Sequence, residues 1–121
     1  MKKFCFKARL KSFHYAGRGI LEILKTQHNA WIHALMTAVV ILTGVYVGFT
    51  EAEWCWCVLS IMAVWTAEAL NTTFELLVDV AAPEFHPLAE KAKDVAAGAV
   101  LISAVGAAII FAIIIFPYLT G

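Results

Sequence analysis

The most informative stretch of the chain is residues 54–79, WCWCVLSIMAVWTAEALNTTFELLVD, which begins as a membrane helix and contains three carboxylates in its last twelve residues. A helix turns about 100° per residue, so Glu75 and Asp79 each lie within about 20° of Glu68 around its axis. A charge at bilayer depth costs roughly 3 to more than 10 kcal/mol, and such side chains usually face a protein interior. The three carboxylates thus form an acidic stripe along one face of the helix. This stripe predicts a functional site, and the alternative is that its members form hydrogen bonds that join helices.

The composition indicates a small integral membrane protein. The 121 residues are 62% hydrophobic and 15% charged, and the mean hydropathy is +0.82. This is too apolar for an ordinary soluble domain. Cys55 and Cys57 would lie about 200° apart on a helix, so a metal pair there is not expected. We predict an all-α integral membrane protein with no nucleic-acid partner.

The distribution of basic residues predicts the topology. Seven of the nine Lys and Arg residues precede the first apolar run, and the other two precede the last one. By the positive-inside rule, both segments are cytoplasmic, as is the N-terminus. The predicted single domain of residues 1–121 then comprises a surface helix (1–28), three spans (30–49, 54–80 and 95–117) and a cytoplasmic loop (81–94).

The N-terminal segment has an amphipathic pattern. Phe6, Leu10 and Phe13 recur at helical spacing, whereas Lys7 and Lys11 occupy the other side. This pattern predicts a helix that lies on the inner membrane surface. Its basic face suits anionic lipid headgroups, or alternatively an anionic cofactor.

Two further features bear on the site. Pro83 and Pro87 should end a helix and present Glu84, Phe85 and His86 to the cytoplasm, although a purely structural turn is the alternative. His33, near the inner end of the first span, is predicted to be a hydrogen-bonded packing residue rather than a ligand.

The site also needs shelter from lipid. Three thin spans should not enclose a large cavity, so we expect the carboxylates to find shelter between subunits of a homo-oligomer.

The stripe and the following basic residue have the parts that phosphoryl transfer needs. Glu75 can hold Mg²⁺, which favours one or two carboxylates plus phosphate oxygens. Lys93 can meet a phosphate as a point charge. Glu68, the deepest carboxylate, is the candidate general base, and its depth implies a hydroxyl that arrives from the membrane. The sequence has no Walker A motif or glycine-rich kinase loop, so a soluble-type kinase is excluded.

Four segments carry a family resemblance. EALNTTFELLVD (68–79) and PEFHPLAEKAKDVAAGAV (83–100) closely resemble the prokaryotic diacylglycerol kinase family, which includes undecaprenol kinases of Gram-positive bacteria. SFHYAGRGI (12–20) is similar to the surface-helix motif of that family, and NAWIH (29–33) to the start of its first span. The resemblance implies a homotrimeric enzyme of the bacterial inner membrane. It would use Mg-ATP to phosphorylate a lipid alcohol in cytoplasmic sites shared between subunits.

The resemblance also implies individual roles. Glu68 would be the catalytic base and Asn71 a supporting polar group, Glu75 would bind the metal and Asp79 would support the site. The nucleotide would contact Tyr15, Glu84, Phe85, His86, Lys93 and Asp94, together with metal-bound Glu75.

One departure from the family pattern concerns the metal. Gln27 stands where a second metal-binding Glu is common in the family. An amide offers Mg²⁺ a carbonyl oxygen but no charge, which weakens the case for Gln27 as a ligand.

Three functions remain open from the residues alone. The lipid kinase is preferred, with a lean to undecaprenol over diacylglycerol that rests on the loop and the AKDVAAGAV run. An ion or proton conduit lined by the stripe would conduct without nucleotide. A structural membrane protein would lose its oligomer, rather than an activity, on Glu68→Gln.

Overall fold

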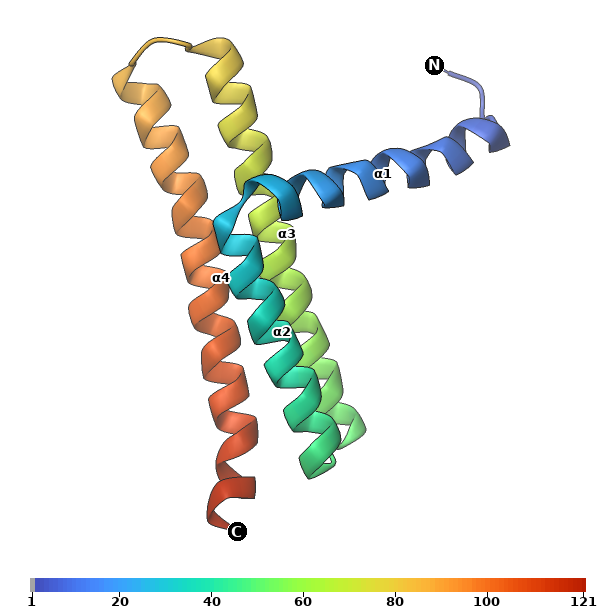
Figure 1. Cartoon of the computed structure of the whole chain (residues 1–121), viewed down its shortest axis with the longest axis vertical. Helices are drawn as coiled ribbons and strands as arrows, with labels where there is room; N and C mark the ends of the chain where they lie inside the picture. The colour runs from blue at the N-terminus through green and yellow to red at the C-terminus, as the bar shows by residue number, and fades with distance from the viewer. Residues whose placement is uncertain (1) are drawn as a thin grey trace.

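A computed structural model describes residues 2–121 as four helices joined by short connections. They are α1 (Phe6–Thr26), α2 (His28–Val47), α3 (Glu51–Ala81) and α4 (Pro87–Thr120) (Figure 1). The last three are long and apolar enough to cross a membrane. The predicted all-helical class with three candidate spans is therefore confirmed.

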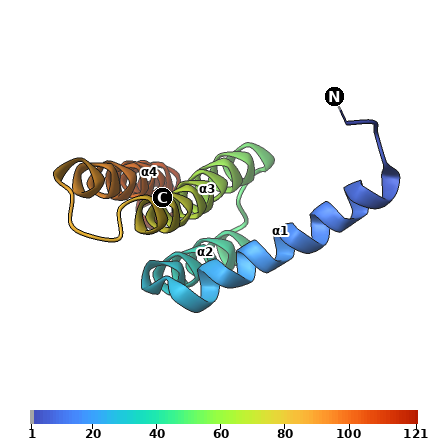
Figure 2. The ribbon, with the colours of Figure 1, turned by 90° about the horizontal axis from the view of Figure 1, so that it is seen from above.

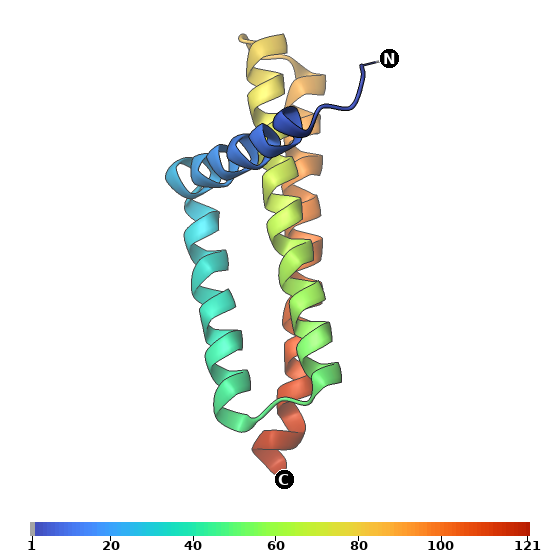
Figure 3. The same cartoon turned by 90° about the vertical axis from the view of Figure 1, so that its right-hand side faces the viewer.

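The longest helices, α3 and α4, form an antiparallel pair, and α2 packs along α3 (Figure 1). Seen from above, α1 leaves the start of α2 and projects away from the other three helices (Figure 2). In the side view, α3 and α4 continue past the level of α1 to the turn that joins them (Figure 3). The C-terminus lies at the opposite end of the bundle.

Local chemistry sets the helix ends. Gly48 adopts a φ of 79°, the left-handed conformation that commonly ends a helix, and so terminates α2. Thr50 caps α3, since its Oγ1 accepts a hydrogen bond from the Glu53 backbone at 3.2 Å. Glu51 and Glu53 in the first turn add favourable interactions with the helix dipole.

The loop predicted over residues 81–94 is wrong in extent, because α4 already begins at Pro87. Proline suits the first position of a helix, where its missing N–H has no partner to lose. His86 caps the helix by accepting the Leu88 N–H at Nδ1, at 3.1 Å. At the other end, α4 runs through Pro117 to Thr120.

A group of aromatic and polar side chains ties the three spans together at the end opposite the α3–α4 turn. We call Gly44, Phe49, Glu53, Trp54 and Tyr118 the distal clasp. The rings of Phe49 and Trp54 pack edge to face with centroids 5.4 Å apart. The Tyr118 hydroxyl donates a 2.6 Å hydrogen bond to Glu53 Oε2, which joins the last turn of α4 to the first turn of α3.

Few side chains are buried within this single chain. The apolar core consists of Ala30, Val40, Phe49, Cys57, Val64, Ala96 and Val100. Large apolar side chains are exposed along every helix, including Phe6 and Phe13 of α1. Such a surface suits a lipid environment and further protein contacts.

Candidate active site

Glu68 is the centre of the polar site. It lies in the middle of α3 and its exposed fraction is 0%. Its Oε2 lies 3.1 Å from Nε2 of His33, which α2 supplies. A buried charge is tolerated only when it is paired and hydrogen-bonded, and this contact provides the partner.

Two buried acceptor oxygens beside this pair have no partner among the described residues. They are Oε1 of Glu68 and Oδ1 of Asn71. The other end of the Asn71 amide donates from Nδ2 to Oε1 of Glu75 at 3.2 Å. A buried polar atom without a partner is costly, so the two free oxygens suit a donor or a cation that arrives with a ligand.

The predicted acidic stripe is present, but its members differ in exposure. Glu68 is fully buried, Glu75 is half-buried and Asp79 is exposed. At about 1.5 Å per residue, Glu68 lies roughly 10 Å from Glu75 along the helix and roughly 16 Å from Asp79. The stripe thus runs from a sheltered carboxylate to an open one.

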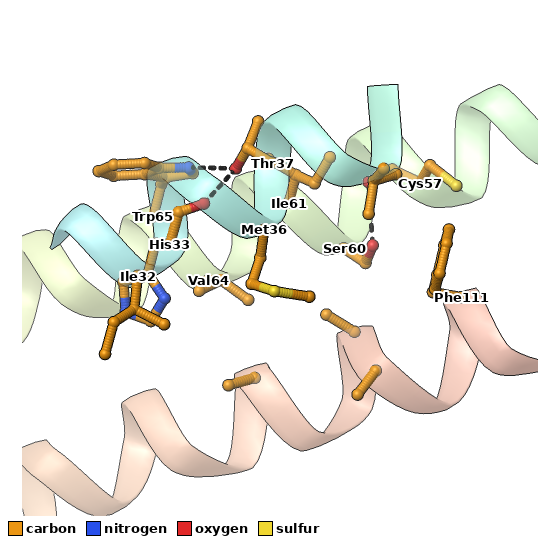
Figure 4. Close-up of a pocket in the computed structure, with 14 residues that line it drawn as sticks. Ile32, His33, Met36, Thr37, Cys57, Ser60, Ile61, Val64, Trp65 and Phe111 are labelled. Carbon is orange, nitrogen blue, oxygen red and sulfur yellow. Dashed lines mark hydrogen bonds between the residues drawn. The ribbon is translucent and has the colours of Figure 1, made fainter. Parts of the chain in front are cut away.

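The expectation that the carboxylates find shelter between subunits is wrong for Glu68, because its exposed fraction is already 0% within one chain. One chain also contains a cavity of about 290 Å³ between α2, α3 and α4. His33 and Trp65 line one end of this cavity and Phe111 lies at the other (Figure 4). Most of the lining is apolar.

His33 is itself held in place by its neighbours. The Thr37 hydroxyl donates to the backbone carbonyl of His33 at 2.7 Å and accepts from the Trp65 indole N–H at 3.1 Å (Figure 4). The indole ring packs against the imidazole with centroids 6.0 Å apart. The prediction that His33 is a hydrogen-bonded packing residue is confirmed, but its partner was missed. The only signal in the sequence was a histidine inside an apolar span.

The α3–α4 turn forms a second, polar site. A hollow of about 140 Å³ is lined by Asp79, the predicted supporting residue, and by four of the predicted nucleotide-contacting residues: Glu84, Phe85, His86 and Lys93. Nζ of Lys93 lies 2.8 Å from Oδ1 of Asp79. This hydrogen bond raises the pKa of Lys93, which precedes the predicted span of 95–117. The structure thus brings these five residues together.

The remaining predicted residues are not joined to either site by side-chain hydrogen bonds within residues 2–121. Tyr15 is exposed on α1, and Asp94 is exposed next to Lys93. Gln27 lies between α1 and α2, and its amide contacts only its neighbour Thr26, at 3.5 Å. The described residues contain no cluster of three or more His, Cys, Asp or Glu side chains that could hold a metal. A single carboxylate such as Glu75 could bind Mg²⁺ only together with other oxygens, such as those of a phosphate.

Comparisons with known proteins identify relatives over most of the chain. The family model for prokaryotic diacylglycerol kinase matches residues 14–115. Undecaprenol kinase of Bacillus subtilis is 42% identical over 109 residues, which cover 90% of this chain and 89% of the relative. Diacylglycerol kinase of Synechocystis is 38% identical over 111 residues, 89% of this chain and 62% of the relative. Diacylglycerol kinase of Helicobacter pylori strain 26695 is 33% identical over 98 residues, which cover 80% of this chain and 76% of the relative.

Proposed function

The chain belongs to the prokaryotic diacylglycerol kinase family, a family of lipid kinases, and from this premise we propose its reaction. It transfers the γ-phosphate of Mg-ATP to the hydroxyl of a membrane lipid alcohol, with undecaprenol preferred to diacylglycerol. The 42% identity to an undecaprenol kinase over nine tenths of both chains supports that preference. Family membership favours a kinase over the conduit and the structural protein.

The observation that carries the proposal is the buried Glu68 carboxylate, of which one oxygen is paired and the other has no partner in the part of the chain that the structure describes. Oε1 of Glu68 accepts the proton of the lipid hydroxyl. The hydroxyl oxygen then bonds to the γ-phosphorus, the bond from that phosphorus to the β–γ bridging oxygen breaks, and ADP leaves. A positioned general base of this kind contributes about 10²- to 10⁴-fold to a rate.

The hollow at the α3–α4 turn is the proposed nucleotide site. Asp79, Glu84 and Glu90 line it together with a single cation, Lys93. Three carboxylates would repel a bare polyphosphate, so the nucleotide needs a divalent cation to bind there. Mg²⁺ would supply charge neutralisation on the phosphates, and Glu75, with its carboxylate already oriented by Asn71, would hold it. The Gln27 amide is the weaker candidate ligand.

Three aspects of the assembly belong to this proposal. The basic and amphipathic α1 lies on the cytoplasmic face of the bacterial inner membrane, with the hollow on the same side. The enzyme is a homotrimer in which neighbouring subunits complete each active site. Tyr15 and Asp94 then contact the nucleotide across a subunit boundary, which agrees with their exposure in the single chain.

The test is transfer of ³²P from Mg-ATP to undecaprenol and to diacylglycerol, measured side by side in mixed micelles. Purified wild type is compared with Glu68→Gln, which keeps the size of the side chain but removes the base. We expect wild type to label undecaprenol more than diacylglycerol, and Glu68→Gln to lose about 10²- to 10⁴-fold in kcat.

The control is the oligomeric state of Glu68→Gln, measured by light scattering in detergent. An active Glu68→Gln variant would contradict the role of the base, and preferential labelling of diacylglycerol would reverse the lipid assignment. Failure of the folded wild type to label either lipid would refute the proposed reaction.

A further inference from the structure

The structure assigns His33 as the residue that positions the catalytic carboxylate, an inference that rests on the proposed role of Glu68. Nε2 of His33 holds Oε2 of Glu68 at 3.1 Å, while Oε1 is buried and has no partner within residues 2–121. His33 thereby decides which of the two carboxylate oxygens receives the proton of the substrate hydroxyl.

The donor in this contact follows from the chemistry of the carboxylate. An ionised carboxylate can only accept hydrogen bonds, so the imidazole must carry a proton on Nε2. When Oε1 takes a proton from the substrate, Oε2 becomes the carbonyl oxygen of the acid and still accepts. The contact therefore persists through proton transfer without a change of tautomer.

The surroundings of His33 fit a positioning role. Its side chain is only 11% exposed, and the Trp65 ring limits its rotation on one side. Thr37 links the two residues, since it donates to the His33 backbone and accepts from the Trp65 indole. A supporting group that is itself fixed in this way can keep a carboxylate in one orientation.

His33 also lines the cavity between α2, α3 and α4, and its Nε2 connects that cavity to the buried Glu68 carboxylate. Because Glu68 is 0% exposed, solvent offers its carboxylate no donor in place of His33. Loss of His33 would leave the Glu68 carboxylate free to rotate about its terminal torsion, because such torsions have broad energy minima.

The kinetic test compares His33→Gln with His33→Leu, using Mg-ATP and undecaprenol in mixed micelles. A glutamine amide can donate an N–H in place of Nε2, whereas leucine cannot. We expect His33→Leu to lower kcat about 10- to 100-fold. The KM for Mg-ATP and the KM for undecaprenol should each change by no more than about threefold. His33→Gln should recover most of the lost kcat. His28→Leu, which removes an exposed imidazole from the same helix, is the matched control and should match wild type.

Three results would overturn the inference: normal kcat in His33→Leu, an equal kcat loss in His33→Gln, or a loss confined to KM. A merely structural histidine would lower the melting temperature without lowering kcat per folded enzyme.

A second measurement tests the pairing without any activity. His33→Leu leaves a buried carboxylate without its donor, so adding Glu68→Leu should recover most of the lost melting temperature. If Glu68→Leu changes the melting temperature equally in wild type and in His33→Leu, the pairing is overturned. Wild-type protein that labels no lipid would contradict the proposed function instead, while this cycle would still decide whether His33 is paired with Glu68.

Discussion

The distal clasp predicts a severe effect of adding a side chain at Gly44. A Cβ atom built there would lie 2.6 Å from Cδ2 of Phe49 and 2.6 Å from Cη2 of Trp54. Ordinary contacts between carbon atoms are about 3.5–4.0 Å, so both rings would have to move. Phe49 is 7% exposed and has little free space. Gly44→Val places two further carbons in the same volume.

We expect Gly44→Val to lower the free energy of unfolding by about 1–3 kcal/mol, the usual cost of overpacking. The helix propensities of glycine and valine differ by only a few tenths of a kcal/mol, roughly, so propensity offsets little of this cost. Thermal melting in detergent, followed by circular dichroism, measures the effect. Gly44 and His33 are separated by about 16 Å along α2, so kcat per folded enzyme should change little.

Gly106→Val is the control, because a Cβ at Gly106 would have no atom of the described residues, 2–121, within 4 Å. Gly106→Val should change the free energy of unfolding by no more than about 0.5 kcal/mol. A wild-type melting temperature in Gly44→Val, or an equal loss of stability in Gly106→Val, would contradict tight packing at Gly44.

Three further predictions concern the metal, the support of His33 and the clasp. Gln27→Glu should lower the Mg²⁺ concentration needed for half-maximal activity severalfold, because it adds a charged ligand; an Mg²⁺ titration of kcat with no shift would remove residue 27 from the metal site. Trp65→Phe keeps a ring against His33 but removes the donor to Thr37, so stability should fall by about 1 kcal/mol in thermal melts, and an unchanged melting temperature would contradict this contact. The hydrogen bond to Glu53 raises the pKa of Tyr118, which follows the predicted span. Wild type should therefore exceed Tyr118→Phe in melting temperature at neutral pH and lose that advantage as the pH rises through the raised pKa; a constant difference would argue against the bond.

Much of the architecture was predictable because its causes are local. Apolar run length identified three candidate spans, and helical periodicity placed Glu68 and Glu75 on one face of α3. The extent of the loop was not predicted correctly, because Pro87 was taken to end a helix, although proline is equally suited to begin one.

The helical class, the family and the acidic stripe could be inferred from the sequence, since each depends on neighbouring residues or on residues one or two turns apart. The contact between His33 and Glu68, 35 residues away, and the complete burial of this carboxylate within one chain arise from the packing of the helices. Such a contact depends on how α2 and α3 are rotated about their axes and how they cross. Periodicity describes each helix alone and cannot specify which faces of two helices meet.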